Sequence, residues 1–322
     1  MQSSQNPIEL IGSEYPLSFD HVIGQDKAKK QIRRAAASAK IRNVPLPHTL
    51  LAKGTPGIGK TALGLLAAKE MGAGVKMASG KIKASQARVL ISGMNDGDVL
   101  LIDEIHQLVA TSKRDAEWLL NYMQDWILLG PLGPEEMPRV TIIGCTTDKG
   151  KLPEPLLERF KLEPELEDYT DPQAADIAAI MAVRIFTSPM LPPSKDNCAS
   201  IAMAANNNPR RIKALLETLR DIVLVEEGAC WTGEGYDLAE LFDSYGLTED
   251  GLTPLAQRYL VTLLHEFGGE PVGVAAIKDR LQEPGGVDTT ERVLMAKGLL
   301  AKTKTGRVLT QPGMKRARQL AA

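Results

Sequence analysis

The residues with the clearest chemical potential form one short run, Gly54 to Thr61, which has the spacing G-x-x-x-x-G-K-[ST] of a phosphate-binding loop. In such a loop the glycines let successive backbone N–H groups face an anion at the N-terminus of the next helix. Lys60 is placed to reach the β- and γ-phosphates, and the Thr61 hydroxyl to bind Mg²⁺. The expected nucleotide-binding residues of this run are Gly54, Thr55, Pro56, Gly57, Ile58, Gly59, Lys60, Thr61 and Ala62.

Two consecutive carboxylates, Asp103 and Glu104, follow an apolar run that starts at Asp98. A strand that delivers two carboxylates is what a Mg²⁺-dependent NTPase needs opposite its phosphate loop. Asp103 is expected to hold the metal together with Thr61, and Glu104 to orient and polarise the attacking water. The alternative is a buried strand that ends in a solvated turn.

A third apolar run, from Arg139 to Thr147, is rich in β-branched residues and ends in two hydroxyls. Because it is expected to lie beside the strand of Asp103, either Thr146 or Thr147 would stand near the γ-phosphate. The sequence leaves open which of the two does so.

Strands that alternate with helices must position these groups. The expected strands are 50–52, 75–78, 98–104 and 139–147, and the expected helices are 26–42, 61–69 and 84–92. This alternation predicts an α/β domain with a doubly wound parallel sheet, in which ligands bind at the carboxyl ends of the strands. All three motifs fall at such ends.

The chain changes character after Arg159, which lies on a short helix at the end of the α/β region. Residues 165–246 hold three or four helical patterns and no convincing strand. Asn208 and Pro209 suit the N-cap and first position of one helix, which puts Arg210 in an exposed first turn. There Arg210 is either a phosphate contact or an ordinary solvated charge.

The last part of the chain predicts a winged helix, a variant of the helix-turn-helix module. Its expected elements are helices 254–267, 273–282 and 289–297, followed by a hairpin over 299–310. The chain is thus expected to comprise an arm over 1–18, an ATPase domain over 19–164, a helical lid over 165–246 and a winged-helix domain over 247–322.

Composition sets further bounds. The chain has 322 residues, 43% hydrophobic and 24% charged, and no apolar run approaches the ~20 residues that span a bilayer. The first residues do not resemble a signal peptide, so a cytoplasmic protein is expected. Cys145, Cys198 and Cys230 are too far apart in sequence to suggest a disulfide framework or a zinc site, and are expected to be core residues.

Charge is distributed unevenly. Residues 251–322 carry eleven Lys/Arg against six Asp/Glu, so residues 1–250 carry a net charge of −7. Anion binding outside the nucleotide site is therefore expected in the C-terminal part of the chain, and no second basic surface is expected in the acidic body.

Taken together, the order and spacing of these motifs resemble the RuvB family of AAA+ ATPases. The resemblance covers nearly the whole chain. Its motifs are Ile23-Gly24-Gln25, Gly54 to Thr61, Asp98 to His106, Gly144 to Thr147, Arg159-Phe160, Pro209-Arg210 and Gly268 to Gly273.

The resemblance implies an ATP- and Mg²⁺-dependent motor, assembled as a hexameric ring, that drives branch migration of Holliday junctions in recombination and repair. It implies that Ile23 and Pro209 line the nucleotide, that Thr146 or Thr147 is the first sensor and that Arg210 is the second. Arg159 would be an arginine finger in the next subunit's site. The DNA-binding residues would be Lys302, Lys304 and Arg307 on the wing.

Departures from the family pattern leave alternatives open. Between Trp126 and Val140 the family carries a longer β-hairpin that grips its junction-binding partner RuvA, whereas the run from Gly130 to Pro134 leaves little room for one. Dependence on a RuvA-like adaptor is therefore left open, and the changes are compatible with a divergent or mobile-element relative. The alternative function is a non-translocating AAA+ switch, similar to a clamp loader or an initiator.

Overall fold

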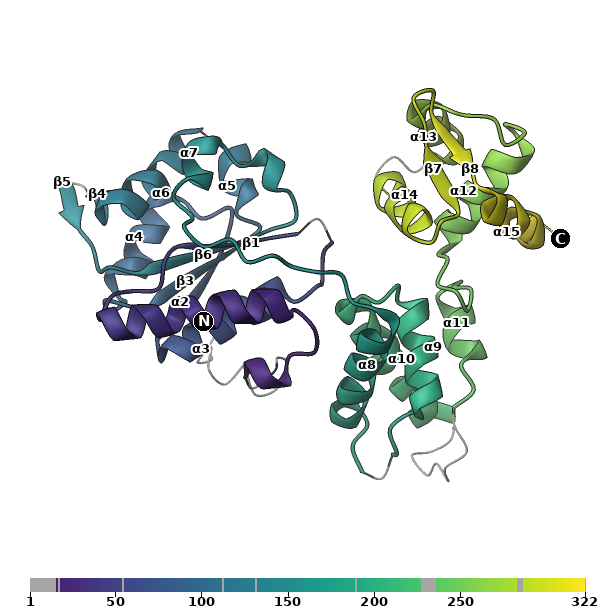
Figure 1. Cartoon of the computed structure of the whole chain (residues 1–322), viewed down its shortest axis with the longest axis horizontal. Helices are drawn as coiled ribbons and strands as arrows, with labels where there is room; N and C mark the ends of the chain where they lie inside the picture. The colour runs from purple at the N-terminus through teal and green to yellow at the C-terminus, as the bar shows by residue number, and fades with distance from the viewer. Residues whose placement is uncertain are drawn as a thin grey trace. The chain divides into compact units, whose positions relative to one another are not determined.

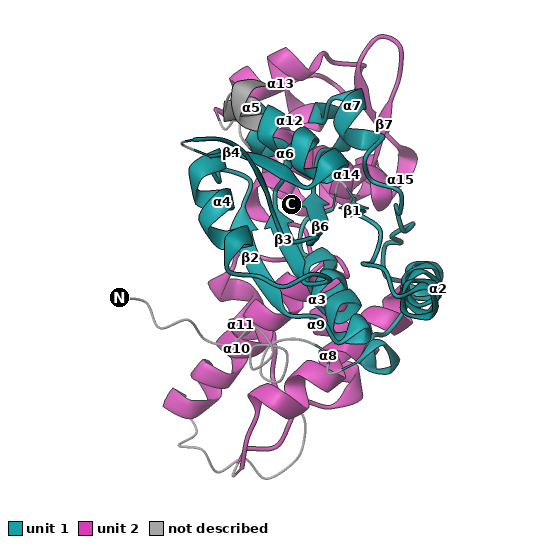
Figure 2. Ribbon diagram, turned by 90° about the vertical axis from the view of Figure 1, so that its left-hand side faces the viewer, with its two compact units in different colours: residues 1–169 teal, residues 170–322 magenta. Residues whose placement is uncertain are grey.

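The computed structural model describes residues 16, 18–53, 55–111, 113–130, 132–188, 190–226, 236–282 and 286–321. The chain divides into two compact units, residues 1–169 and 170–322 (Figure 2). Each unit is described by itself.

A four-stranded parallel sheet forms the centre of the first unit, and its strands run in the order β1-β6-β3-β2. The strands are β1 (Thr49–Ala52), β2 (Val75–Ser79), β3 (Val99–Asp103) and β6 (Thr141–Thr146). Runs of apolar and β-branched residues favour strands that are buried on both faces. The doubly wound sheet predicted from the sequence is confirmed, including the pairing of β3 with β6.

Helices cover both faces of this sheet (Figure 1). Side chains alternate along β3, so Leu100 and Ile102 pack in one core with α4 to α7, whereas Val99 and Leu101 pack in the other with α2 and α3. The helices of this unit are η1 (Phe19–His21), α2 (Asp26–Arg42), α3 (Lys60–Met71), α4 (Ala84–Ser92), α5 (His106–Thr111), α6 (Lys113–Asp125), η2 (Lys149–Lys151) and α7 (Glu154–Leu157).

A β-hairpin stands where the sequence was expected to leave little room for one. Strands β4 (Ile127–Gly130) and β5 (Gly133–Glu136) pair antiparallel, with Gly130 opposite Gly133. This short hairpin forms because two residues suffice to close it, and Gly133 adopts a φ of 131° at the turn. Of the two turn residues, Pro131 lies outside the described residues.

The second unit begins with helices and ends in the predicted winged helix. Helices α8 (Asp171–Ile185), α9 (Lys195–Ala204), α10 (Pro209–Glu226) and α11 (Ala239–Ser244) come first. The winged helix holds α12 (Pro254–His265), α13 (Val274–Leu281), α14 (Val287–Ala296), β7 (Leu300–Lys302), β8 (Arg307–Leu309) and α15 (Gln311–Ala321). Helix α15 was not anticipated, although Thr310 marks its start by accepting a hydrogen bond from the Gly313 N–H at 3.1 Å.

The wing passes very close to the segment before α13. Val272 and Arg307 exchange backbone hydrogen bonds, and a Cβ on Gly306 would lie 2.3 Å from the Val272 carbonyl oxygen. Gly306 has a φ of 153°, so any side chain there would be both strained and obstructed. This glycine therefore fixes where the wing leaves the domain.

Two of the three cysteines, Cys145 and Cys198, are buried and form no disulfide, which confirms their prediction as core residues. Cys230 lies outside the described residues. Among the helices in the described ranges, none is both long and apolar enough to cross a membrane.

His48 makes the first unit sensitive to acid. Its ring is buried, its Nδ1 accepts a hydrogen bond from the Ile142 N–H at 2.9 Å, and it packs 5.1 Å from the Trp126 ring. Burial lowers the pKa of His48 from 6.5 to about 4. The unfolded chain therefore binds the proton more readily, and the stability due to neutral His48 is present above pH 6.5 and is lost as pH falls toward 4.

We expect the free energy of unfolding of the first unit to fall by about 2 kcal/mol more in wild type than in His48→Asn between pH 7 and pH 5. Asparagine can accept the same backbone hydrogen bond but does not titrate. Urea unfolding followed by tryptophan fluorescence measures the difference, and parallel pH profiles of the two proteins would contradict it.

Candidate nucleotide site and DNA-binding wing

The phosphate loop connects β1 to α3 and closes around the side chain of its own lysine. Gly57 and Gly59 adopt φ values of 77° and 99°, which glycine tolerates best. Only 7% of Lys60 is exposed, and its Nζ donates to the carbonyl oxygens of Lys53 and Thr55 at 3.0 and 3.1 Å. A buried ammonium beside neutral carbonyls favours an anion next to it. Gly54 is outside the described residues.

The carboxyl ends of three strands meet beside this loop. Ala52 of β1 pairs with Thr146 of β6, and Ile102 of β3 pairs with Gly144 of β6. Parallel pairing therefore brings the start of the phosphate loop, Asp103 at the end of β3, and Thr146 to one edge of the sheet. Thr61 and Asp103 are both half-buried and offer the oxygen donors that Mg²⁺ prefers.

Glu104 is held in a strained turn. Its φ is 48°, a left-handed value that is uncommon outside glycine and concentrates at functional sites. Gly80 makes the turn possible, because its N–H donates to the Asp103 carbonyl at 2.7 Å and a Cβ at Gly80 would lie 2.1 Å from the Glu104 carbonyl oxygen. The backbone after β2 therefore fixes the position of the Glu104 backbone.

Two side chains contact the Glu104 carboxylate, and one of them also contacts Thr146 at the end of β6. The Thr147 hydroxyl and N–H donate to Glu104 Oε2 at 3.0 and 3.3 Å. His106 Nδ1 lies 3.1 Å from the same oxygen and 2.9 Å from the Thr146 hydroxyl. Thr146 is fully buried, whereas Thr147 contacts the carboxylate directly. The pattern of residues did not single out His106, although it stands two positions after Glu104.

A second group of contacts, also missed from the sequence, covers the phosphate loop from residues 167–169. The Tyr169 hydroxyl donates to the Ile58 carbonyl at 3.1 Å. The Thr55 hydroxyl donates to Asp168 Oδ1 at 3.1 Å, and Asp168 Oδ2 lies 3.2 Å from Lys53 Nζ. The segment that leads into α8 is thus tied to the nucleotide site. No sequence spacing signals this, because the contacts join residues that are 111 to 115 positions apart.

The Ile23-Gly24-Gln25 segment is tied to the same region. Ile23 is half-buried between η1 and α2. The Gln25 side chain donates to the Glu167 carbonyl at 2.7 Å and accepts from the Glu167 N–H at 3.1 Å. The Gln25 side chain therefore joins the segment that contains Ile23 to the segment that covers the loop.

The two arginines predicted for the site have different surroundings. Arg159 follows α7, is half-buried, and donates to the Gln124 side chain of α6. Arg210 belongs to the second unit, where it is exposed in the first turn of α10. Asn208 caps that helix as predicted, accepting from the Arg210 and Arg211 N–H groups at 3.1 and 3.3 Å, and Pro209 is its first residue.

The three residues of the wing that were predicted to contact DNA have two different surroundings. Lys302 and Lys304 are exposed. The guanidinium of Arg307 turns inward, where Nε and Nη2 donate to the buried Glu291 carboxylate at 2.9 to 3.0 Å. The Tyr259 hydroxyl donates to the same carboxylate at 2.9 Å. Glu291 raises the pKa of Arg307 further above its ordinary value, so the guanidinium stays charged. In the sequence Lys302, Lys304 and Arg307 are three similar basic residues, and only the fold shows that Arg307 pairs with Glu291.

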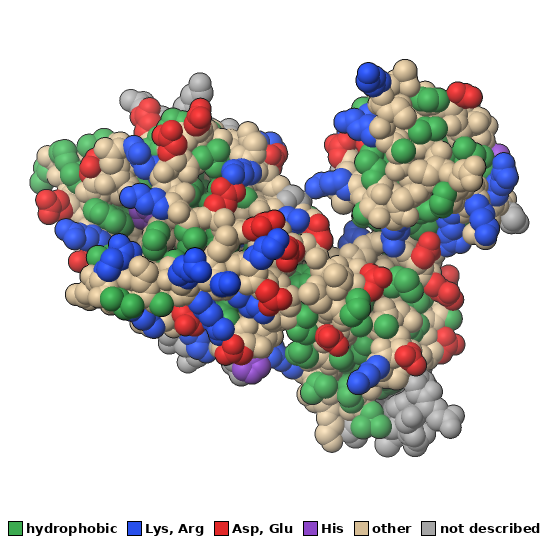
Figure 3. Space-filling model, in the orientation of Figure 1, with side chains coloured by type: hydrophobic (Ala, Val, Ile, Leu, Met, Phe, Trp, Pro, Cys, Tyr) green, Lys and Arg blue, Asp and Glu red, His purple; other side chains and the backbone are tan. Residues whose placement is uncertain are grey.

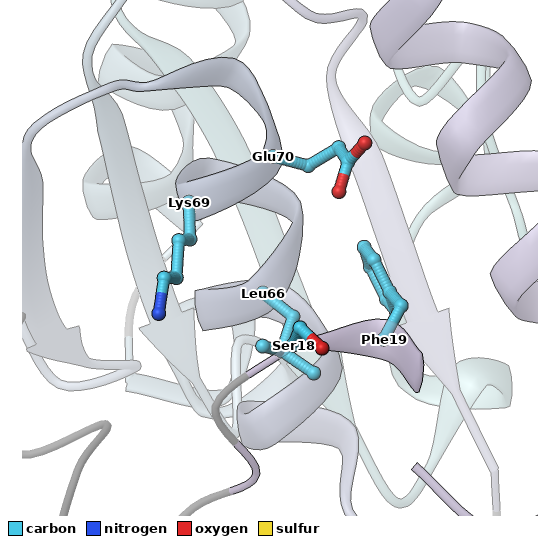
Figure 4. A pocket seen from close by; sticks show the side chains of 5 residues that line it. All are labelled: Ser18, Phe19, Leu66, Lys69 and Glu70. Atoms are coloured by element: carbon cyan, nitrogen blue, oxygen red, sulfur yellow. The ribbon is translucent and has the colours of Figure 1, made fainter. Parts of the chain in front are cut away.

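A shallow pocket with a volume of about 230 Å³ lies elsewhere in the first unit (Figure 4). It is lined by Ser18, Phe19, Leu66, Lys69 and Glu70. Leu66 and Glu70 lie roughly 9 to 15 Å along α3 from Lys60, at 1.5 Å per residue. This pocket is therefore separate from the nucleotide site.

Comparisons with known proteins agree with this geometry. Residues 15–166 match the family model for the Holliday junction DNA helicase RuvB P-loop domain, and residues 249–317 match the RuvB C-terminal winged helix domain. The chain is 33% identical over 313 residues to the Holliday junction branch migration complex subunit RuvB of Desulfosudis oleivorans, covering 92% of this chain and 87% of that protein. It is 34% identical over 310 residues to the subunit of the same name from a Nocardioides species, covering 92% and 82%.

A solved structure agrees as well. The Thermotoga maritima RuvB Holliday junction branch migration motor superposes with a TM-score of 0.78 at 28% identity, covering 94% of this chain and 97% of that one. Similarity over the phosphate-loop domain, the winged helix and nearly the full length of each relative leads to one conclusion: this chain is a member of the RuvB family of AAA+ ATPases.

Proposed function

We propose that the protein is an ATP-driven motor that moves DNA and drives branch migration of Holliday junctions. One observation carries the proposal: Lys60, Asp103 and Glu104 converge at one sheet edge in a chain that ends in a winged helix. Its relatives over more than four fifths of their length are named subunits of the branch migration complex.

ATP is the nucleotide that we propose for the site, with its phosphates beside Lys60 and the N–H groups of the loop from Thr55 to Gly59. The hydroxyl of Thr61 and the carboxylate of Asp103 fit Mg²⁺, because both present oxygen at the same edge. When bound, the ion neutralises charge on the phosphates. Ile23 and Pro209 are proposed to line the nucleotide.

Glu104 is proposed to act on the attacking water. Its carboxylate already accepts hydrogen bonds from Thr147, so it is oriented before substrate arrives. His106 joins the carboxylate to Thr146, the residue at the end of the strand that pairs with β1. We propose Thr147 as the side chain that holds Glu104, and Thr146 as the residue that responds to the γ-phosphate through His106.

Assembly completes the site in this proposal. Arg159 is proposed as the finger for the neighbouring subunit of a hexameric ring, and Arg210 as the sensor from the lid. The proposed division of the chain remains an arm over 1–18, an ATPase domain over 19–164, a lid over 165–246 and a winged-helix domain over 247–322. In this role the Arg159 side chain must break its hydrogen bond to Gln124 before it enters the nucleotide site of the neighbouring subunit.

DNA and an adaptor are proposed to use different surfaces. Exposed Lys302 and Lys304 suit phosphate contacts that are independent of sequence. The β4-β5 hairpin exposes 75% of Leu129 and 100% of Leu132. Two exposed leucines on one hairpin favour a protein partner, so we propose that this hairpin binds a RuvA-like adaptor.

Wild-type protein should hydrolyse ATP faster with a four-way junction than with a linear duplex of equal length, and should couple hydrolysis to strand exchange. Lys60→Ala should lose turnover and bind ATP weakly, whereas Glu104→Gln should bind ATP but fail to hydrolyse it. Turnover without strand exchange would favour the AAA+ switch instead. Near-normal hydrolysis by Lys60→Ala would refute the ATPase site.

Arg159→Ala should bind ATP with near-normal affinity yet hydrolyse it ~10³-fold more slowly, because a finger acts on the transition state. Mixing this variant with Lys60→Ala should restore part of the activity, since some interfaces then pair an intact loop with an intact finger. Full activity of Arg159→Ala by itself would exclude the role across subunits.

Lys302→Ala combined with Lys304→Ala should weaken duplex binding equally for all sequences, and should reduce the slope of log K against log[salt] by about 2, at ~0.9 per lost phosphate contact. Thermal stability should not change. Titrations across a salt series measure the slope.

Arg307→Ala should behave differently from the lysine variant. Side chains of Glu291 and Arg307 are only 6% and 17% exposed, so removing one partner should cost about 3 kcal/mol or more of stability. A lowered melting temperature of the winged-helix domain is the expected result. Unchanged melting with a flattened salt slope would instead make Arg307 a direct DNA contact.

A further inference from the structure

A basic surface lies on the first unit, where the acidic net charge of residues 1–250 suggested none. Helix α2 alone carries seven Lys/Arg and one Asp. Residues 1–169 hold 21 Lys/Arg and 21 Asp/Glu, so the net charge of −7 falls on residues 170–250. The expectation that the body lacks a second basic surface was therefore wrong. Figure 3 shows Lys and Arg side chains gathered over the helix drawn as α2 in Figure 1.

Part of this charge has a structural use. Lys27 pairs with Glu167 at 2.9 Å, and Lys29 pairs with Asp26 and donates to the Val22 carbonyl. Arg33 pairs with Asp20 and lies 5.5 Å from the centre of the Phe19 ring. These contacts attach the helix to its neighbours.

Of the four other cations of the helix, Arg42 donates to the Ser38 carbonyl of the same helix, and three have no such use. Lys30, Arg34 and Lys40 are exposed, and the structure gives them no ion pair among the residues it describes. Lys30 and Arg34 are four positions apart, a spacing at which like charges repel and destabilise a helix. An anion that binds between Lys30 and Arg34 would offset this repulsion.

We propose that this surface, formed by Lys30, Arg34 and Lys40, binds the phosphate backbone of DNA as a second contact besides the wing. From Lys30 to Lys40 the helix is roughly 15 Å long, at 1.5 Å per residue. That length is the rise of about four nucleotides of one strand, at ~3.4 Å each. Exposed Ser38 lies four positions, about one turn, after Arg34 on the helix and offers a hydroxyl donor of the kind that binds phosphate oxygens.

The proposal rests on the proposed function, which supplies DNA as the polyanion. The test is duplex binding by the full-length protein across a salt series. The variant combines Lys30→Gln, Arg34→Gln and Lys40→Gln, and the expected result is a slope of log K against log[salt] reduced by about 2 to 3. A matched control combines Arg139→Gln, Lys161→Gln and Arg184→Gln, which are exposed and likewise given no ion pair within the described ranges.

The outcomes separate the two proposals. A reduced slope in the α2 variant, with normal slope in the control and normal ATP turnover without DNA, supports the second contact. An unchanged slope overturns it while leaving the wing and the motor intact. If the variant changes the molecular mass of the assembly and leaves the slope unchanged, the proposal is overturned too. The surface then contacts the acidic region of a second copy. Failure of wild type to bind any duplex would refute the proposed function itself.

Discussion

The parallel register of β1, β6 and β3 is the constraint on which the site depends. Parallel strands end at one edge of a sheet, so pairing Ala52 with Thr146 and Ile102 with Gly144 places together three chain segments that are far apart in sequence. Burial on both faces fixes this register, because a shift by one residue would exchange the cores that Leu100 and Leu101 occupy.

Within that edge, polar groups are held by neighbouring atoms of the chain. The ammonium of Lys60 lies among carbonyls of its own loop, and the Glu104 carboxylate is held in a left-handed turn that only a glycine at position 80 can accommodate. Such groups interact strongly in a low-dielectric setting, which makes them costly to leave unpaired and effective once a phosphate arrives. Tyr169 and Asp168, which belong to the segment that leads into α8, also form hydrogen bonds with the phosphate loop. A change in the loop conformation therefore acts on this segment and, through the chain, on the helices that follow.

In the winged-helix domain, a buried carboxylate turns a basic side chain away from the solvent. Glu291 is a buried carboxylate, and Arg307 and Tyr259 together satisfy it. Since Arg307 begins β8, the same contact that neutralises the carboxylate also holds the wing that presents Lys302 and Lys304. Helix α2 offers the opposite case, because its Lys30, Arg34 and Lys40 are exposed and have no ion pair within the described residues.

Sequence by itself determined the elements and the chemistry of the nucleotide site. The run from Gly54 to Thr61, the Asp103-Glu104 pair and the alternation of apolar runs are local signals, since loop shape and strand burial depend on neighbouring residues. Tertiary structure alone decided the partners. His106 and Tyr169 join the site, Arg307 turns to Glu291, and the hairpin at Gly130 forms, because each depends on contacts or backbone geometry that linear spacing does not encode.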